Sequence, residues 1–150
     1  CIGGNQLPLY SVHALRAVGV FDERLFFGFD DLEFGLRLNA HGFGVFAHGE
    51  LWLRERQHYG RTNLQRTPQF TLDDPSWRRY YSLRNLVYIL RRSGHSLAAA
   101  RLMVRSMAKP IANLPSNPQL ALAHLRLNAR ALADAQRGRM GRTVEPVAKY

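Results

Sequence analysis

The chain has 150 residues and a net charge of +10, and 46% of its residues are hydrophobic, as is ordinary for a globular protein. This composition argues against a largely disordered chain. The single cysteine, Cys1, excludes an intramolecular disulfide framework. No run of about 18 apolar residues is present, so the sequence predicts no membrane-spanning helix.

The charge is distributed unevenly along the chain. Residues 1–50 carry three basic and six acidic side chains, a net charge of −3, whereas residues 51–150 carry a net charge of +13. From Pro75 to Ala133 there are ten Lys or Arg residues and no acid. This asymmetry predicts an anionic partner for the second half, either a nucleic acid or a lipid surface.

In chain order, the first predicted elements are two short helices. Ser11 is a suitable N-cap for the helix VHALRAVG, which ends at Gly19. After an aromatic connector, FDERLFFGF, Asp30 stands where an N-cap belongs and Glu33 follows at the capping-box spacing. This second helix is expected to run to about His41. The segments GVFAH and ELWLRE are predicted to be short strands or extended segments.

The remaining elements are predicted to be helical. WRRYYSLRNLVYILRR follows the helix-start signal of Asp74 and Pro75 and ends near Gly94. SLAAARLMVRSMAK is predicted to break at Pro110, and QLALAHLRLNARALADAQR forms a third helix. The sequence thus predicts an α/β part over residues 1–72 and a basic, amphipathic helical region over residues 73–150.

The acids at the start of the second helix have two interpretations. Carboxylates in a first helical turn are stabilised by the helix dipole by about 0.3–1 kcal/mol each, which explains Asp30 and Glu33. Asp31 is not needed for capping. The alternative is that these acids carry the chemistry of an active site.

The order of the motifs resembles one enzyme family. The segment GVFDERLFFGFDDLEFGLRLNAHGF, followed by His58 with Gly60 and then WRRYYSLRN, is similar to the C-terminal half of inverting family 2 glycosyltransferases, with galactofuranosyl- and rhamnosyltransferases as the nearest likeness. The resemblance covers about residues 2–92. It implies the acceptor-side half of a GT-A, Rossmann-like domain over residues 1–72, with the N-terminal nucleotide-binding half missing. The family's Asp-x-Asp motif does not occur in this sequence, so this fragment alone is expected to be inactive.

What the resemblance implies is transfer of a sugar from a nucleotide-diphosphate donor to an acceptor hydroxyl, with inversion, in cell-surface polysaccharide synthesis. By its place in the motif, Asp31 matches the general base, and Asp30 and Glu33 hold the turn and contact the acceptor. His58 matches a ligand of a divalent cation, Mn²⁺ or Mg²⁺, beside the diphosphate. His48 is the fallback ligand, while His41 is expected to close a helix. Four residues are expected to bind substrate, with an ordinary turn and core packing as their alternatives: Gly3, Gly4, Asn5 and Trp52.

The first basic helix also suggests a location. One face is expected to pack its aliphatic stripe on the core, and the other combines aromatic and basic residues, which suits an anionic membrane surface. The residues expected to face the membrane are Trp77, Arg78, Arg79, Tyr81, Arg84 and Tyr88. We therefore expect a peripheral enzyme on the cytoplasmic side of the cell membrane, acting on glycan or lipid-linked acceptors. The alternatives are a nucleic-acid- or membrane-binding module without catalysis, or a helical scaffold.

Overall fold

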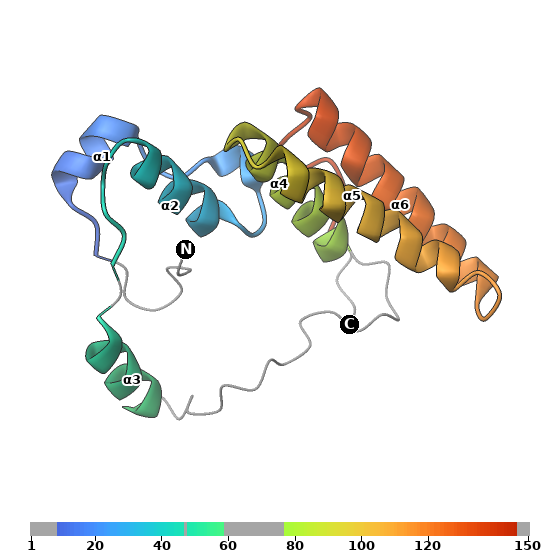
Figure 1. The fold of residues 1–150 in the computed structure, drawn as a ribbon, viewed down its shortest axis with the longest axis horizontal. Helices are drawn as coiled ribbons and strands as arrows, with labels where there is room; N and C mark the ends of the chain where they lie inside the picture. The colour runs from blue at the N-terminus through green and yellow to red at the C-terminus, as the bar shows by residue number, and fades with distance from the viewer. Residues whose placement is uncertain (1–8, 47, 59–76, 147–150) are drawn as a thin grey trace. The chain divides into compact units, whose positions relative to one another are not determined.

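The computed structural model describes residues 9–46, 48–58 and 77–146. Within these ranges the secondary structure is helical, with no strand, so the predicted α/β class and the Rossmann-like domain are wrong. The helices, labelled in Figure 1, are α1 (Val12–Val18), a 3-10 turn η1 (Glu23–Leu25), α2 (Asp30–Ala40), α3 (Gly49–His58), α4 (Trp77–Arg92), α5 (Ser96–Ala112) and α6 (Pro118–Arg137). No described helix combines the length and the apolar character that a bilayer crossing requires.

Helix α3 corrects the strand predicted at ELWLRE. The alternation of Leu51 and Leu53 fits a strand, but the segment is rich in Glu, Leu, Arg and Gln, which are strong helix formers. The Leu51 N–H also donates to the His48 side chain at 3.2 Å, which satisfies a donor at the start of the helix. Local helix propensity and this cap therefore outweigh the two-residue alternation.

The chain divides into two compact units. One comprises Cys1–Phe21 with Asp31–Thr71, and the other comprises Asp22–Asp30 with Leu72–Tyr150. In the first unit, α1 and α2 share a small core in which Ala14, Phe34 and Leu38 are buried. The predicted bounds of these two helices are confirmed to within one or two residues, and Gly19 and Gly42, which follow them, have φ of 79° and 80°.

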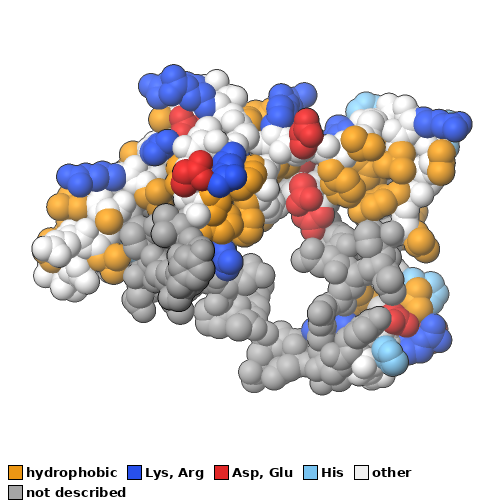
Figure 2. All heavy atoms as spheres, turned by 180° about the vertical axis from the view of Figure 1, so that it is seen from behind, with side chains coloured by type: hydrophobic (Ala, Val, Ile, Leu, Met, Phe, Trp, Pro, Cys, Tyr) orange, Lys and Arg blue, Asp and Glu red, His pale blue; other side chains and the backbone are white. Residues whose placement is uncertain are grey.

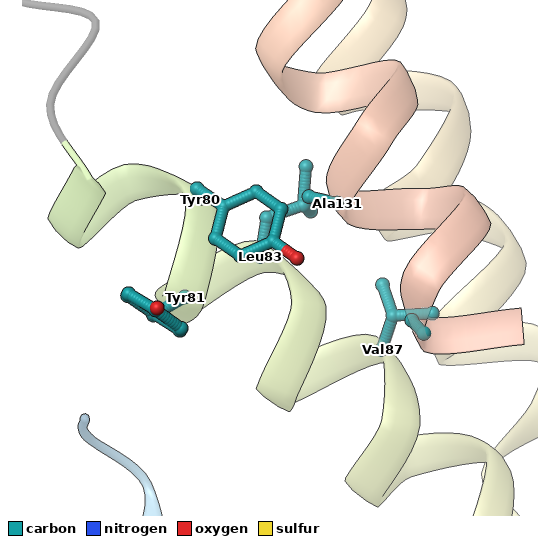
Figure 3. Packing of buried hydrophobic residues seen from close by; sticks show 6 residues of the cluster. Tyr80, Tyr81, Leu83, Val87 and Ala131 are labelled. Carbon is teal, nitrogen blue, oxygen red and sulfur yellow. The ribbon is translucent and has the colours of Figure 1, made fainter. Parts of the chain in front are cut away.

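The second unit is a bundle of α4, α5 and α6, which run side by side in Figure 1. Its core contains Tyr80, Leu83 and Val87 of α4, which Figure 3 shows pointing toward the helix that carries Ala131. These residues lie on the aliphatic face that the sequence predicts for this helix. Tyr81 points to the other side of α4 and is also fully buried, so α4 is covered on two faces.

Helix α5 continues through Pro110 to Ala112, so the predicted break at this proline is wrong. Proline has no N–H to bond the carbonyl four residues earlier, which here belongs to Ser106. The buried Asn128 of α6 donates its Nδ2 to that carbonyl at 2.6 Å. Asn128 also accepts from Arg79 of α4 at 3.3 Å, and burial lowers the pKa of Arg79. One amide thus repairs the helix and links all three helices of the bundle.

A buried polar pair joins α4 to α6. The Tyr80 hydroxyl lies 2.6 Å from Asp134 Oδ2, to which it donates, and 2.7 Å from the Thr143 hydroxyl. Burial, and secondly the hydrogen bond to Asp134, raise the pKa of Tyr80. The protonated phenol is therefore favoured in the folded protein.

We predict that Tyr80→Phe lowers the free energy of unfolding by about 1–3 kcal/mol, because it leaves Asp134 without this donor. In the parent protein, the contribution of Tyr80 is fully present below the unfolded-state pKa of about 10 and is lost as the pH rises through the higher folded-state pKa. Urea unfolding at increasing alkaline pH measures both effects. Tyr88→Phe, which removes a half-buried hydroxyl bonded to Arg92, is the matched control and should change stability by under about 0.5 kcal/mol. Equal losses in the two variants would contradict the prediction.

Candidate functional site

The acidic motif occupies the first turn of α2. Asp30 is exposed, and its carboxylate has no hydrogen bond or ion pair with a described residue. Asp31 is half-buried and accepts the Leu32 N–H on Oδ1 at 2.8 Å. No Lys or Arg within the described ranges pairs with either carboxylate. The helix N-terminus therefore presents two carboxylates with acceptor capacity to spare.

Glu33 has a different role from its two neighbours. Its two carboxylate oxygens accept from Arg37, one turn later, at 2.9 Å each. Arg37 also donates to the backbone carbonyls of Val18 and Val20, at the end of α1 and just beyond it. This network fixes α1 against α2, and it occupies the Glu33 carboxylate. The expectation that Glu33 holds the turn agrees with these bonds, and its contact with an acceptor stays a prediction.

The backbone before the acidic motif is conformationally strained. Phe26 and Phe29 have φ of 59° and 66°, and Gly28 between them has φ of 72°. Left-handed conformations cost a bulky side chain on the order of 1–3 kcal/mol each, so the surrounding contacts must hold them in place. Phe29 directly precedes Asp30, so this strained loop determines where α2 begins.

The contacts that hold the loop come from Asn85, which is fully buried in α4. Its Nδ2 donates to the carbonyls of Leu25, Phe27 and Gly28 at 2.7, 2.9 and 3.2 Å. Its Oδ1 accepts from Arg84 Nε at 3.0 Å. One amide side chain therefore uses both its donor and its acceptor groups in the interior of the second unit.

Arg84 is the second buried polar group of α4, with no exposed surface. It donates to the carbonyls of Leu25 and Gly141 at 3.2 and 2.7 Å, and its guanidinium lies 4.7 Å from the Tyr81 ring centre. Carbonyl dipoles and the ring face stabilise this cation, which has no carboxylate partner in the part of the chain that the structure describes. We call Arg84 and Asn85 together the clamp. Sequence reasoning missed it, although an Arg-Asn pair within an otherwise aromatic and aliphatic helix was a signal.

Burial of the clamp corrects the predicted membrane face of α4. Tyr81 and Arg84 are fully buried and cannot face a membrane. Trp77 and Tyr88 are half-buried against the core, and Arg79 is half-buried against Asn128. Of the six predicted residues, Arg78 alone is exposed. The expectation that α4 packs an aliphatic face on the core is confirmed by Leu83 and Val87, but Tyr81, Arg84 and Asn85 on the polar side contact residues 22–30 and 141–144.

The predicted metal ligands do not form a ligand set within the described residues. His58 is the exposed last residue of α3, and His48 accepts the Leu51 N–H at the start of the same helix. His41 Nδ1 lies 2.8 Å from the Arg37 carbonyl, consistent with the predicted helix-closing residue. No group of three or more His, Cys, Asp or Glu side chains in these ranges could hold a metal ion. The expected Mn²⁺ or Mg²⁺ site stays a prediction.

The predicted substrate-binding residues have separate outcomes. Trp52 is half-buried in α3, and the Arg56 guanidinium lies 4.7 Å from its ring centre. One face of this indole is therefore occupied by a cation. Gly3, Gly4 and Asn5 lie outside the described residues.

Comparison of the chain with protein-family models, with curated proteins and with solved structures gave no match. The function must therefore be argued from the residues and their geometry.

We predict that Asn85→Ala lowers the free energy of unfolding by about 1–3 kcal/mol, because the Phe27 and Gly28 carbonyls lose the Asn85 donor and the Leu25 carbonyl loses one of its donors. Hydrogen exchange at residues 25–29 should rise with it. Asn39→Ala, at an exposed position of α2, is the control and should change stability by under about 0.5 kcal/mol. Unchanged exchange in a folded Asn85→Ala variant would show that the clamp does not hold the loop.

Proposed function

We propose that the chain supplies the acceptor-side base of an inverting glycosyltransferase that resembles family 2. The observation that carries the proposal is the state of Asp31: a half-buried carboxylate at a helix N-terminus, with no cationic partner within the described ranges. Glu33 on the same turn is occupied by Arg37, so the motif separates a structural acid from an available one. The proposal does not depend on a Rossmann-like sheet.

The chemistry requires one proton transfer. An acceptor hydroxyl oxygen forms the new bond to the sugar's anomeric carbon while the bond to the departing nucleotide diphosphate breaks on the opposite face. The hydroxyl proton passes to Asp31, which must be ionised and reachable for this step. The partial exposure of Asp31 allows an acceptor to approach it. The exposed Asp30 carboxylate can accept a hydrogen bond from a second acceptor hydroxyl.

Donor binding is assigned to sequence other than these 150 residues. The chain has no Asp-x-Asp, and the described residues offer no ligand set for a divalent cation. We therefore propose that the 150-residue chain alone is inactive and that turnover needs a nucleotide-binding part. Cell-surface glycan synthesis at the cytoplasmic side of the membrane, on a glycan or lipid-linked acceptor, is the setting that the resemblance supports.

A basic binding module without catalysis is the competing function. It accounts for the excess of Lys and Arg in the second unit, and Figure 2 shows such side chains at the surface in several separate groups. It gives no role, however, to the available carboxylates of Asp30 and Asp31.

The first test is to sequence the coding DNA upstream of Cys1. An in-frame nucleotide-binding part with an Asp-x-Asp supports the enzyme, and an open reading frame that begins near Cys1 overturns it. The longest chain that the frame encodes is then assayed for transfer of labelled sugar from a panel of nucleotide-sugars to membrane-derived acceptors.

In that chain, we predict that Asp31→Asn lowers turnover by about 10²–10⁴-fold, the usual contribution of a general base, with donor affinity unchanged. Glu23→Gln, the same chemical change at an exposed position of η1, is the control and should retain turnover. Helix content and unfolding midpoint are measured for both variants. Retained turnover in a folded Asp31→Asn variant would contradict the assignment of Asp31 as the general base.

A further inference from the structure

Helix α5 has a second apolar face that points away from the bundle core. Leu97, Val104 and Ile111 are 66%, 69% and 52% exposed, and they recur every seven residues. At 3.6 residues per turn this spacing places them on one side of the helix, two turns apart. The exposed Ala100 and Ala108 lie between them on the same side. We call these five residues the outer stripe.

The outer stripe is distinct from the face that α5 packs on the core. Ala99 and Pro110 are buried, and Leu102 and Met103 pack against the core cluster. Ordinary surface helices have one apolar face and a polar opposite face. Three large aliphatic residues repeated along the outside of α5 are more than that pattern explains.

A row of cations lies along one edge of the outer stripe. Arg101, Arg105 and Lys109 are four residues apart, exposed, and without a hydrogen bond or ion pair to any described residue. Helix α5 contains no acid. The helix therefore presents an aliphatic stripe and, directly beside it, cations available to an external partner.

We propose that the outer stripe and its basic row dock α5 on an anionic lipid surface. A helix lying in the interface buries its apolar side among acyl chains and keeps its cations at the anionic headgroups, which is the arrangement α5 presents. At 1.5 Å per residue, α5 would lie along about 25 Å of surface. This docking does not rest on the proposed catalysis.

Two other occupants fit the same face less well. A nucleic acid would engage the cations, but single strands bind by stacking on aromatic rings, and the outer stripe has none. A second copy of α5 would cover the stripe, but it would bring two basic rows to one seam with no acid on either helix to pair them. Anionic lipid matches both the apolar and the charged part.

The repair of Pro110 contributes to this face. Ile111 follows the proline and belongs to the stripe because α5 continues to Ala112. The Asn128 amide that bonds the freed Ser106 carbonyl therefore supports the last turn of the docking face.

The experiment is flotation of the 150-residue chain with vesicles of phosphatidylcholine, alone or with phosphatidylglycerol as about a third of the lipid. We expect binding to the anionic vesicles that weakens with salt, and much weaker binding to the neutral ones. Equal binding to both, or none to either, would overturn the proposal.

Two triple variants test the residues. Arg101→Gln, Arg105→Gln and Lys109→Gln together should lower partitioning about 100-fold, at roughly fivefold for each basic group. Leu97→Ser, Val104→Ser and Ile111→Ser together should lower it by at least about tenfold. The control triple, Arg16→Gln, Arg54→Gln and Arg139→Gln, removes the same net charge from exposed positions outside α5 and should lower partitioning less than about threefold.

Circular dichroism establishes that each variant keeps its helix content, as expected for exposed positions. Control and α5 charge variants that lose binding equally would show attraction by net charge alone and would overturn the assignment of the face. Analytical ultracentrifugation of the chain without vesicles completes the test. A dimer that the stripe variant dissociates, without vesicle binding by the parent chain, would assign the face to a second copy instead.

Discussion

The second unit depends on two polar side chains buried where an apolar pair would be expected. Arg84 and Asn85 have no exposed surface, and among the described residues no carboxylate pairs with the guanidinium. Their partners are backbone carbonyls, chiefly of residues 25–28, which belong to a loop without regular backbone bonding. The two sides satisfy each other, because the buried Arg84 and Asn85 donors need acceptors and the carbonyls of Leu25, Phe27 and Gly28 accept from them. This mutual need attaches residues 22–30 to a helix far along the chain.

Burial also decides which basic side chains are available to an external partner. The sequence counts Arg79 and Arg84 among ten cations between Pro75 and Ala133, but both are occupied inside the second unit. The basic face expected on α4 is therefore partly internal, and exposed cations beside an exposed apolar stripe are found on α5. An excess of positive charge predicts an anionic partner, but only the packing shows which helix presents it.

The sequence predicted most helices and the position of the acidic motif. Caps and apolar periodicity located α1, α2 and the three helices of the bundle, because those signals are local. The i to i+4 pairing of Glu33 with Arg37 was also readable from spacing. The role of Asn85 was not, because its partners are 57–60 residues away. The same holds for Asn128, whose amide on another helix lets α5 continue through Pro110. The strand prediction at α3 was wrong because Leu51 and Leu53 fit the two-residue alternation of a strand but are equally compatible with a helix.

The long-range bonds of α4 also set an order of events during synthesis. Asn85 leaves the ribosome 57–60 residues after the carbonyls that it bonds, so residues 25–28 emerge without their donor. Arg84 bonds the Gly141 carbonyl and Tyr81 bonds Val144, a further 57 and 63 residues along. The second unit can therefore close only after translation has passed Val144. Until Asn85 has emerged, the strained loop before the acidic helix lacks the side-chain donor that holds its left-handed backbone, so this loop cannot acquire its final conformation before α4 has been synthesised.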